Sequence, residues 1–108
     1  MEPLQVFTTL PDEAGAARLA RALVERRLAA CAQVVGPVTS TYRWQGAVEQ
    51  AQEWLCLMKT DRGHWPELEK AITELHPYDT PEIIALPITA ASERYRAWLA
   101  ASVGPAED

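Results

Sequence analysis

The feature that most constrains the fold is the stretch 32–60, which has the pattern of a long β-hairpin. Polar residues alternate with apolar or aromatic ones over 38–44 and again over 53–59, with Gln45-Gly46 between the two runs. A two-residue period rich in β-branched and aromatic residues is typical of strands, and glycine supplies the positive φ that a hairpin turn usually needs. Each arm is longer than the average strand of about five or six residues. A small sheet cannot pair so much edge, so we expect part of the hairpin to contact another subunit.

The segments on either side of the hairpin predict two further strands and three helices. Apolar residues at three- and four-residue spacing mark the helices, and Asp12 and Ser92 are suited to cap two of them. Gly36-Pro37 interrupts the first hairpin arm and predicts a bend or a bulge there. The expected elements are, in chain order, a strand over 4–9, a helix over 12–27, a strand over 28–35, the remainder of the hairpin, a helix from 60 or 61 to 75, a strand over 82–88 and a helix after Ser92.

This order, β-α-β-β-α-β with an additional C-terminal helix, predicts an α+β protein with a ferredoxin-like sandwich. In that architecture a four-stranded antiparallel sheet carries two helices on one face, and here it has an extended hairpin between its second and third strands. The apolar run 83–86 does not alternate, which favours burial of the last strand on both faces. We expect a single domain over residues 1–108. Because many activities occur on this fold, function has to be argued from sites.

Composition narrows the possible partners and the compartment. The net charge is -5, from 15 acidic and 10 basic residues, which argues against nucleic acid or an anionic membrane surface as a partner. The sequence contains no apolar run of the ~20 residues that span a bilayer, and its N-terminus lacks the pattern of a signal peptide. We therefore predict a cytoplasmic protein. Cys31 and Cys56 lie in apolar strand contexts and are expected to be free, buried thiols.

The sequence carries no motif of an enzyme. It has no GxSxG turn, no glycine-rich phosphate loop, no HExxH and no CxxC. Cys31 is a candidate nucleophile beside His76, but a thiol in an apolar strand is more often an inert core group. His76, next to Pro77, is also suited to a structural role at a helix C-terminus. We predict a protein without catalytic activity.

Two charged residues favour a ligand-binding cleft. Lys59 and Glu82 each lie at the end of an apolar strand, where burial requires a partner. Aromatic residues also gather near strand ends, and aromatic surface combined with ionisable groups is typical of a pocket for a polar ligand; the aromatics alone would equally suit a core or an interface. The predicted cleft, between subunits, is lined by Tyr42, Trp44, Lys59, His76, Tyr78, Glu82, Tyr95 and Trp98.

Five short motifs resemble those of a known family. They are the runs LAACA at 28–32, STYRWQG at 40–46, Lys59-Thr60, HPYDTPE at 76–82 and LPI at 86–88. In this order they closely resemble the CutA divalent-cation tolerance proteins, over nearly the whole chain from Val6 to Leu99. The resemblance implies a ferredoxin-like subunit, a tight homotrimer joined through the extended hairpins, and an association with tolerance to copper and other divalent metals.

The resemblance also implies a metal site, of which this chain keeps only a part. Some bacterial relatives have a cysteine near the end of the first strand and a His-His pair before Pro-Tyr, and these are the family's proposed copper ligands. Here Thr8 and Leu75 occupy two of those positions, and only His76 matches. A single imidazole is insufficient for tight binding, so we expect weak binding of copper or another divalent cation at His76, with carboxylates such as Glu82 or ligands from a neighbouring subunit.

Two other functions stay open. One is a signalling module similar to the PII family, in which trimers of ferredoxin-like subunits bind small effectors in clefts between subunits. The sequence lacks the glycine-rich cradle and the long basic loop that nucleotide phosphates would need. The other is a stable trimeric scaffold for further proteins.

Overall fold

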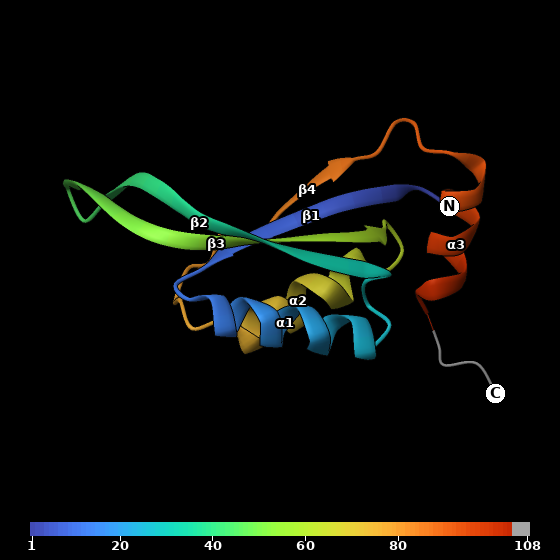
Figure 1. Ribbon diagram of the computed structural model, residues 1–108, viewed down its shortest axis with the longest axis horizontal. Coiled ribbons are helices and arrows are strands. Elements are labelled where there is room, and N and C mark those ends of the chain that lie inside the picture. Colours follow the sequence, from blue (N-terminus) through green and yellow to red (C-terminus); the bar gives the residue numbers. More distant parts are fainter. Residues whose placement is uncertain (105–108) are drawn as a thin grey trace.

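The long hairpin predicted from the sequence is the most extended part of the protein. Strands β2 (Cys31–Trp44) and β3 (Ala47–Asp61) form it, and its tip projects beyond the rest of the sheet (Figure 1). Gln45 and Gly46 make the turn with φ of 49° and 83°, the left-handed conformation that two-residue hairpin turns use. The structure, a computed structural model, describes residues 1–104.

The sheet has the strand order β2-β3-β1-β4, and every neighbouring pair is antiparallel. This topology confirms the predicted ferredoxin-like α+β fold with an additional C-terminal helix. Among residues 1–104 no helix has the length and apolar character required to cross a membrane. The remaining elements are β1 (Pro3–Leu10), α1 (Glu13–Glu25), α2 (Trp65–Leu75), β4 (Ile84–Pro87) and α3 (Glu93–Ser102).

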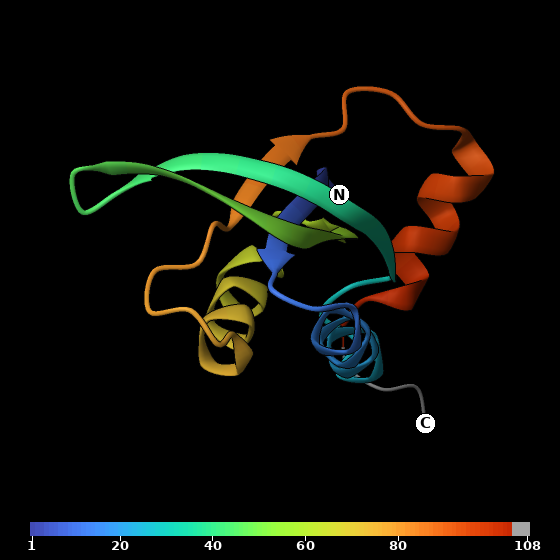
Figure 2. The same ribbon diagram turned by 60° about the vertical axis from the view of Figure 1, so that its left-hand side comes forward.

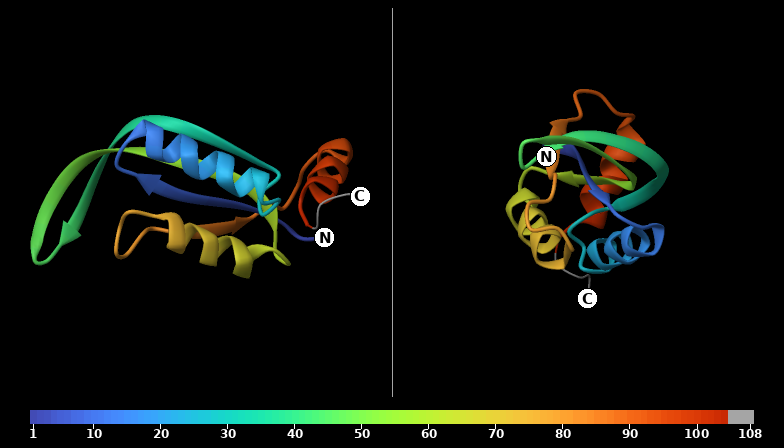
Figure 3. Two further views of the ribbon diagram at one scale, coloured as in Figure 1. Left: turned by 90° about the horizontal axis from the view of Figure 1, so that it is seen from below. Right: turned by 90° about the vertical axis from the view of Figure 1, so that its left-hand side faces the viewer.

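Helices α1 and α2 lie side by side on one face of the sheet, which we call the covered face (Figures 2 and 3). The Asp12 carboxylate accepts a hydrogen bond from Gly15 N and caps α1, as predicted. Because buried residues recur along α1 at three- and four-residue spacing, one side of the helix packs onto the strands. The core between helices and sheet includes Leu4, Val6, Leu10, Leu23, Cys56, Met58, Leu68 and Ile72.

The other face of the sheet, which we call the open face, carries apolar side chains that α1 and α2 do not cover. Val35, Ile84 and Leu86 are 47%, 41% and 49% exposed. The prediction that β4 is buried on both faces therefore does not hold within one chain: Ala85 packs against the core, while its neighbours point away from the helices. Strand alternation places on this face Phe7, Val35, Leu55, Leu57, Ile84 and Leu86.

A β-bulge divides the first hairpin arm where Gly36-Pro37 predicted an irregularity. Val35 pairs with Leu55 and Val38 pairs with Glu53, so two residues of β2 lie opposite Trp54. Because side chains alternate between the two faces of a strand, the extra residue absorbed by the bulge shifts this alternation by one position in the sequence. The bulge therefore turns Tyr42 and the other even-numbered residues of the outer arm, from Val38 to Trp44, toward the open face.

Several element boundaries differ from the sequence prediction. Helix α1 ends at Glu25 rather than near Arg27, whose φ of 59° is incompatible with a continuing helix. Strand β3 continues to Asp61, and α2 begins only at Trp65. The Asp61 carboxylate accepts a hydrogen bond from His64 N at 2.9 Å, so it orders the turn that precedes the helix.

Candidate functional site: a cavity beside the hairpin

A cavity of about 680 Å³ lies between the outer part of the hairpin and the loop that joins α2 to β4; we call it the hairpin cavity. Figure 1 shows this loop at the end of the sheet from which the hairpin projects, with α3 at the opposite end. The cavity has the size of a small-molecule site. Its lining residues are Thr9, Ser40, Thr41, Tyr42, Trp44, Glu49, Glu53, Pro77, Tyr78, Asp79, Thr80 and Glu82.

Glu53 is the most buried charged group of the hairpin cavity, with 7% of its surface exposed. The Tyr78 hydroxyl donates a hydrogen bond of 2.8 Å to Glu53 Oε2. Burial, first, and then the hydrogen bond to the carboxylate raise the pKa of Tyr78 above its usual value, so the phenol stays protonated as a donor. This bond joins the hairpin to the loop after α2.

His76 lies beside the cavity and is buried at 8% exposure. Its Nδ1 accepts a hydrogen bond from Tyr78 N at 3.1 Å, and its Nε2 lies 2.8 Å from the carbonyl oxygen of Thr9. Both bonds together fit the neutral imidazole with its proton on Nε2. Burial lowers the pKa of His76, while the hydrogen bond to Thr9 and the charge of Glu53 act in the opposite direction.

The donor set of a single chain does not fit a tight metal site. Both ring nitrogens of His76 are already in hydrogen bonds, so coordination would require one of these bonds to break. Residues 1–104 contain no group of three or more His, Cys, Asp or Glu side chains arranged to hold a metal ion. Thr8, at the position of the relatives' cysteine, is fully buried in the core.

Seven of the eight residues of the predicted cleft fall into two groups within one chain, and His76 lies beside the first group. Four line the hairpin cavity, and His76 contacts one of them, Tyr78, through a hydrogen bond. Lys59 lies toward the other end of β3: at about 3.3 Å per residue, the strand separates it from Glu53 by about 20 Å. The cavity group consists of Tyr42, Trp44, Tyr78 and Glu82, and the distant group of Lys59, Tyr95 and Trp98.

The distant group lies where α3 meets the sheet: Lys59 pairs with Cys31 across the strands, Tyr95 contacts Cys31, and Trp98 packs against Tyr95. The Tyr95 hydroxyl is 3.4 Å from Cys31 Sγ, and this contact together with burial raises the pKa of Tyr95 to about 12. Lys59 Nζ donates to Gln33 Oε1 at 3.1 Å. Cys31 and His76 therefore lie at opposite ends of the sheet, which removes the candidate nucleophile pair. Cys56 is a free, buried thiol as predicted, and burial raises its pKa to about 11, which disfavours the reactive thiolate; Cys31 is also free but only half-buried, so the prediction of burial was wrong for it.

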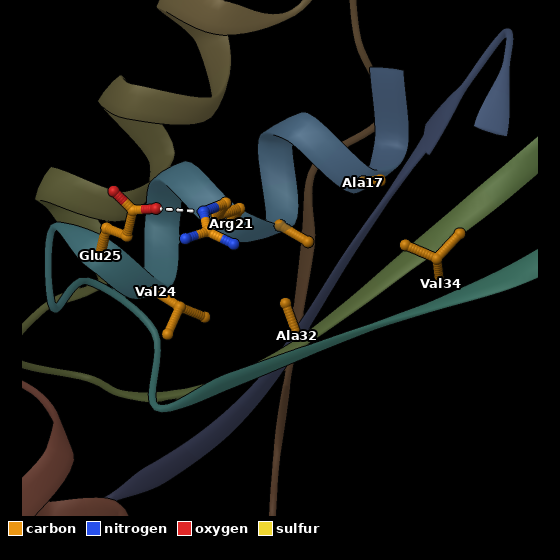
Figure 4. Close-up of a pocket in the computed structure, with 7 residues that line it drawn as sticks. Ala17, Arg21, Val24, Glu25, Ala32 and Val34 are labelled. Atoms are coloured by element: carbon orange, nitrogen blue, oxygen red, sulfur yellow. Dashed lines mark hydrogen bonds and ion pairs between the residues drawn. The ribbon is translucent and has the colours of Figure 1, made fainter. Parts of the chain in front are cut away.

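A second hollow lies between α1 and the edge strand β2 (Figure 4). Its walls are apolar, with Ala17, Val24 and Val34 among the lining residues. The charged groups at its rim, Arg21 and Glu25, pair with each other across one helical turn. Because its charges are compensated internally, this hollow offers less specific chemistry than the hairpin cavity.

The most important cavity residue was missed by the sequence prediction. Glu53 opens the apolar run 54–58, and a carboxylate at such a position resembles Glu82, which the prediction did single out. The same argument, that a charge at the end of an apolar strand needs a partner when buried, would have identified it. Asp79 and Glu49 lack a comparable signal, since turns and hairpin tips are commonly polar.

The sequence model described as "CutA1 divalent ion tolerance protein" matches residues 4–102. The chain belongs to the CutA1 divalent ion tolerance family. The divalent-cation tolerance protein CutA of Thermus thermophilus is 48% identical over 99 residues, which cover 92% of this chain and 96% of that protein. The protein of the same name from Pectobacterium atrosepticum is 42% identical over 98 residues, covering 91% and 89%.

Solved CutA1 structures have the same fold. A structure of Cut A1 from T. thermophilus has a TM-score of 0.91 at 47% identity and covers 96% of this chain and 100% of its own. CutA1 from Oryza sativa has a TM-score of 0.94 at 33% identity, with coverage of 98% and 97%. The resemblance to the CutA family drawn from the motifs is thus confirmed, together with the fold that it implied.

Proposed function

We propose that the protein is a cytoplasmic homotrimer that binds divalent cations weakly, contributes to tolerance of copper or a related metal, and catalyses no reaction. The family supports the general role, since this chain shares it with proteins named for divalent-cation tolerance. The observation that carries the proposal is the apolar open face. Three of its side chains are more than 40% exposed in a single chain, which points to burial by other copies.

The edges of the sheet support the same assembly. Strand β2 is at one edge with 14 residues, and the short β4 is at the other. A long unpaired edge favours pairing with another chain, and cyclic closure leaves no edge free. Sedimentation equilibrium at decreasing protein concentration tests this step: we expect the mass of three chains throughout, and a monomer would refute the trimer.

For the metal, we propose His76 as the main ligand, assisted by a carboxylate such as Glu82 or by a neighbouring subunit. Binding is expected to be weak because the imidazole has to give up a hydrogen bond, and weaker still at low pH because only neutral imidazole coordinates. Calorimetric titration of copper into the wild type, His76→Gln and the control His64→Gln tests the assignment. We expect loss of binding in His76→Gln alone; tight binding by the wild type would contradict the weak site.

The hairpin cavity favours a second candidate function, that of a PII-like module that binds a small effector between subunits. In this interpretation the distant group of one subunit, with Lys59, would complete the cavity of the next. A thermal-shift comparison of divalent ions with nucleotides separates the two functions, because a ligand stabilises the protein only if it binds the folded state.

A further inference from the structure

Helices α1 and α3 end next to each other, at the end of the sheet opposite the hairpin tip (Figure 1). After α1, Arg27 N donates to Val24 O and Leu28 N donates to Leu23 O, each at 3.0 Å, which is the pattern of a Schellman C-cap. Arg27 occupies the left-handed position of this motif, with φ of 59°. Glycine is the usual residue there, because a Cβ atom is unfavourable in that conformation. An arginine at this position therefore has a steric cost, which contacts of its side chain can offset.

The Arg27 side chain makes its contacts with the C-terminal end of α3. Its guanidinium donates from Nε to Gly104 O and from Nη2 to Ala101 O, both at 2.9 Å. Gly104 N donates in return to Arg27 O at 3.0 Å. We call these three hydrogen bonds the Arg27 latch. They join residues that are 74 and 77 positions apart in the sequence.

The latch supplies a cap that α3 lacks in its own sequence. The last carbonyl groups of a helix have no partners within the helix and carry partial negative charge, which a cation stabilises. The last turn of α3 has no basic residue of its own. Gly104 follows that turn with φ of 106°, a left-handed conformation that directs its backbone toward Arg27. Arg27 therefore caps α3 from a distant part of the chain.

Helix α3 has few other attachments to its own chain. Within residues 1–104, the latch and the contact between Tyr95 and Cys31 are the only hydrogen bonds that join residues 93–104 to residues before Ser92. A segment with few contacts is expected to open locally more easily than the core. The apolar cluster that also holds the helix is small and separate from the main core; it consists of Ala30, Leu99 and Val103.

We propose that α3 is a strap that opens and closes as a unit, and that the Arg27 latch holds it closed. Opening would separate Tyr95 from Cys31 and would move Trp98, which packs against Tyr95. Arg27 is thus a positioning residue for two members of the predicted cleft, although it does not belong to the cleft itself. This inference goes beyond metal tolerance, and it requires neither a metal ion nor His76.

Hydrogen–deuterium exchange of the assembled protein tests the proposal, with peptides from α3 compared with peptides from α1. Arg27→Gly removes the guanidinium but accepts the left-handed backbone readily, so the cap of α1 is kept. We expect α3 to exchange at least about tenfold faster in this variant, because the loss of one charge-assisted hydrogen bond suffices for that factor. Helix α1 should exchange within about twofold of its wild-type rate.

Two further variants separate the latch from charge and from general stability. Arg26→Gln removes the neighbouring exposed charge and should leave α3 unchanged. Gly104→Ala disturbs the latch from its other side, since alanine disfavours φ of 106°, and should accelerate α3 while Arg27 is still present. Wild-type exchange of α3 in Arg27→Gly or Gly104→Ala would overturn the proposal. Equal acceleration of α1 and α3, or an equal effect of Arg26→Gln, would also overturn it.

Discussion

The two faces of the sheet carry similar apolar residues in very different surroundings. On the covered face, Val6 and Met58 are fully buried beneath α1 and α2. On the open face, Val35 and Leu86 are nearly half exposed, although they belong to the same four strands. Since composition does not separate the faces, the difference comes from where the two helices pack. One face completes the fold of a subunit, and the other is available for association.

Adjacent residues of β3 allow the two faces to be compared directly, and the covered face should give the largest effect. Met58 is fully buried, so Met58→Ala should lower the free energy of unfolding by about 2–5 kcal/mol through lost burial and the cavity that remains. The oligomeric state should not change. Urea unfolding and sedimentation velocity measure both quantities. A loss well below that range would mean that the covered face is not the main core.

Leu57, the next residue along, points to the open face and should show the reverse pattern. Leu57→Lys should leave the secondary structure of the subunit intact and shift the protein toward smaller species, because a charge would be buried in the proposed interface. Circular dichroism and sedimentation velocity test the two parts. If the variant keeps its native mass, the open face is not the contact surface.

A smaller effect on stability is expected at the bulge, where Gly36 lies opposite Trp54. A methyl group added at Gly36 would lie 2.7 Å from Trp54 Cγ, so Gly36→Ala forces the indole or the bulge to move. Overpacking of this kind costs about 1–3 kcal/mol. At Gly63 the nearest atom, Asp61 Oδ1, is at 3.5 Å, and Gly63→Ala serves as the control with little expected change. Equal unfolding midpoints of the two variants would show that the bulge accommodates the added methyl group without loss of stability.

The smallest expected effect is a pH dependence of stability that arises from His76. Because burial lowers the pKa of His76 in the folded state, folding favours the neutral imidazole. Its contribution is fully present above the unfolded pKa of about 6.5 and is lost as the pH falls toward the folded pKa. The stability difference between wild type and His76→Gln should therefore shrink from about pH 8 to about pH 5. A difference that grows on acidification would mean that the pKa is raised.

The elements with local signals could be predicted from the sequence. Alternation identified the hairpin, and the side chains of Asp12 and Ser92 cap α1 and α3 as expected. Both caps depend on contacts within three residues, and the hairpin turn and the bulge fall at the short sequence signals Gln45-Gly46 and Gly36-Pro37. The chemistry of these segments is therefore visible in short windows.

The parts that depend on distant contacts could not be predicted in this way. Strand β4 is shorter than the predicted strand 82–88 because it pairs only with Leu4 to Phe7 of β1. Farther along β1, the carbonyl of Thr9 lies within hydrogen-bond distance of the His76 side chain rather than pairing with β4. Likewise, the cavity arises where the hairpin meets the 77–82 loop, and Glu53 and Tyr78 are 25 positions apart in the sequence. No pattern within a short stretch of sequence indicates that these two residues come into contact.

In the first arm of the hairpin, a substitution and a change of chain length at the bulge opposite Trp54 affect the cavity differently. A substitution at Tyr42 or Trp44 changes the cavity by degrees, since size, polarity or charge can vary while the position is kept. Removing one residue between Val35 and Val38 would leave a single residue opposite Trp54 and keep the aromatic rings on the side of Glu53, whereas removing both would pair Val38 with Trp54 and send the rings to the other side. In this arm the cavity therefore depends on which residue of β2 pairs with Glu53, a property of the strand register that no single side chain carries.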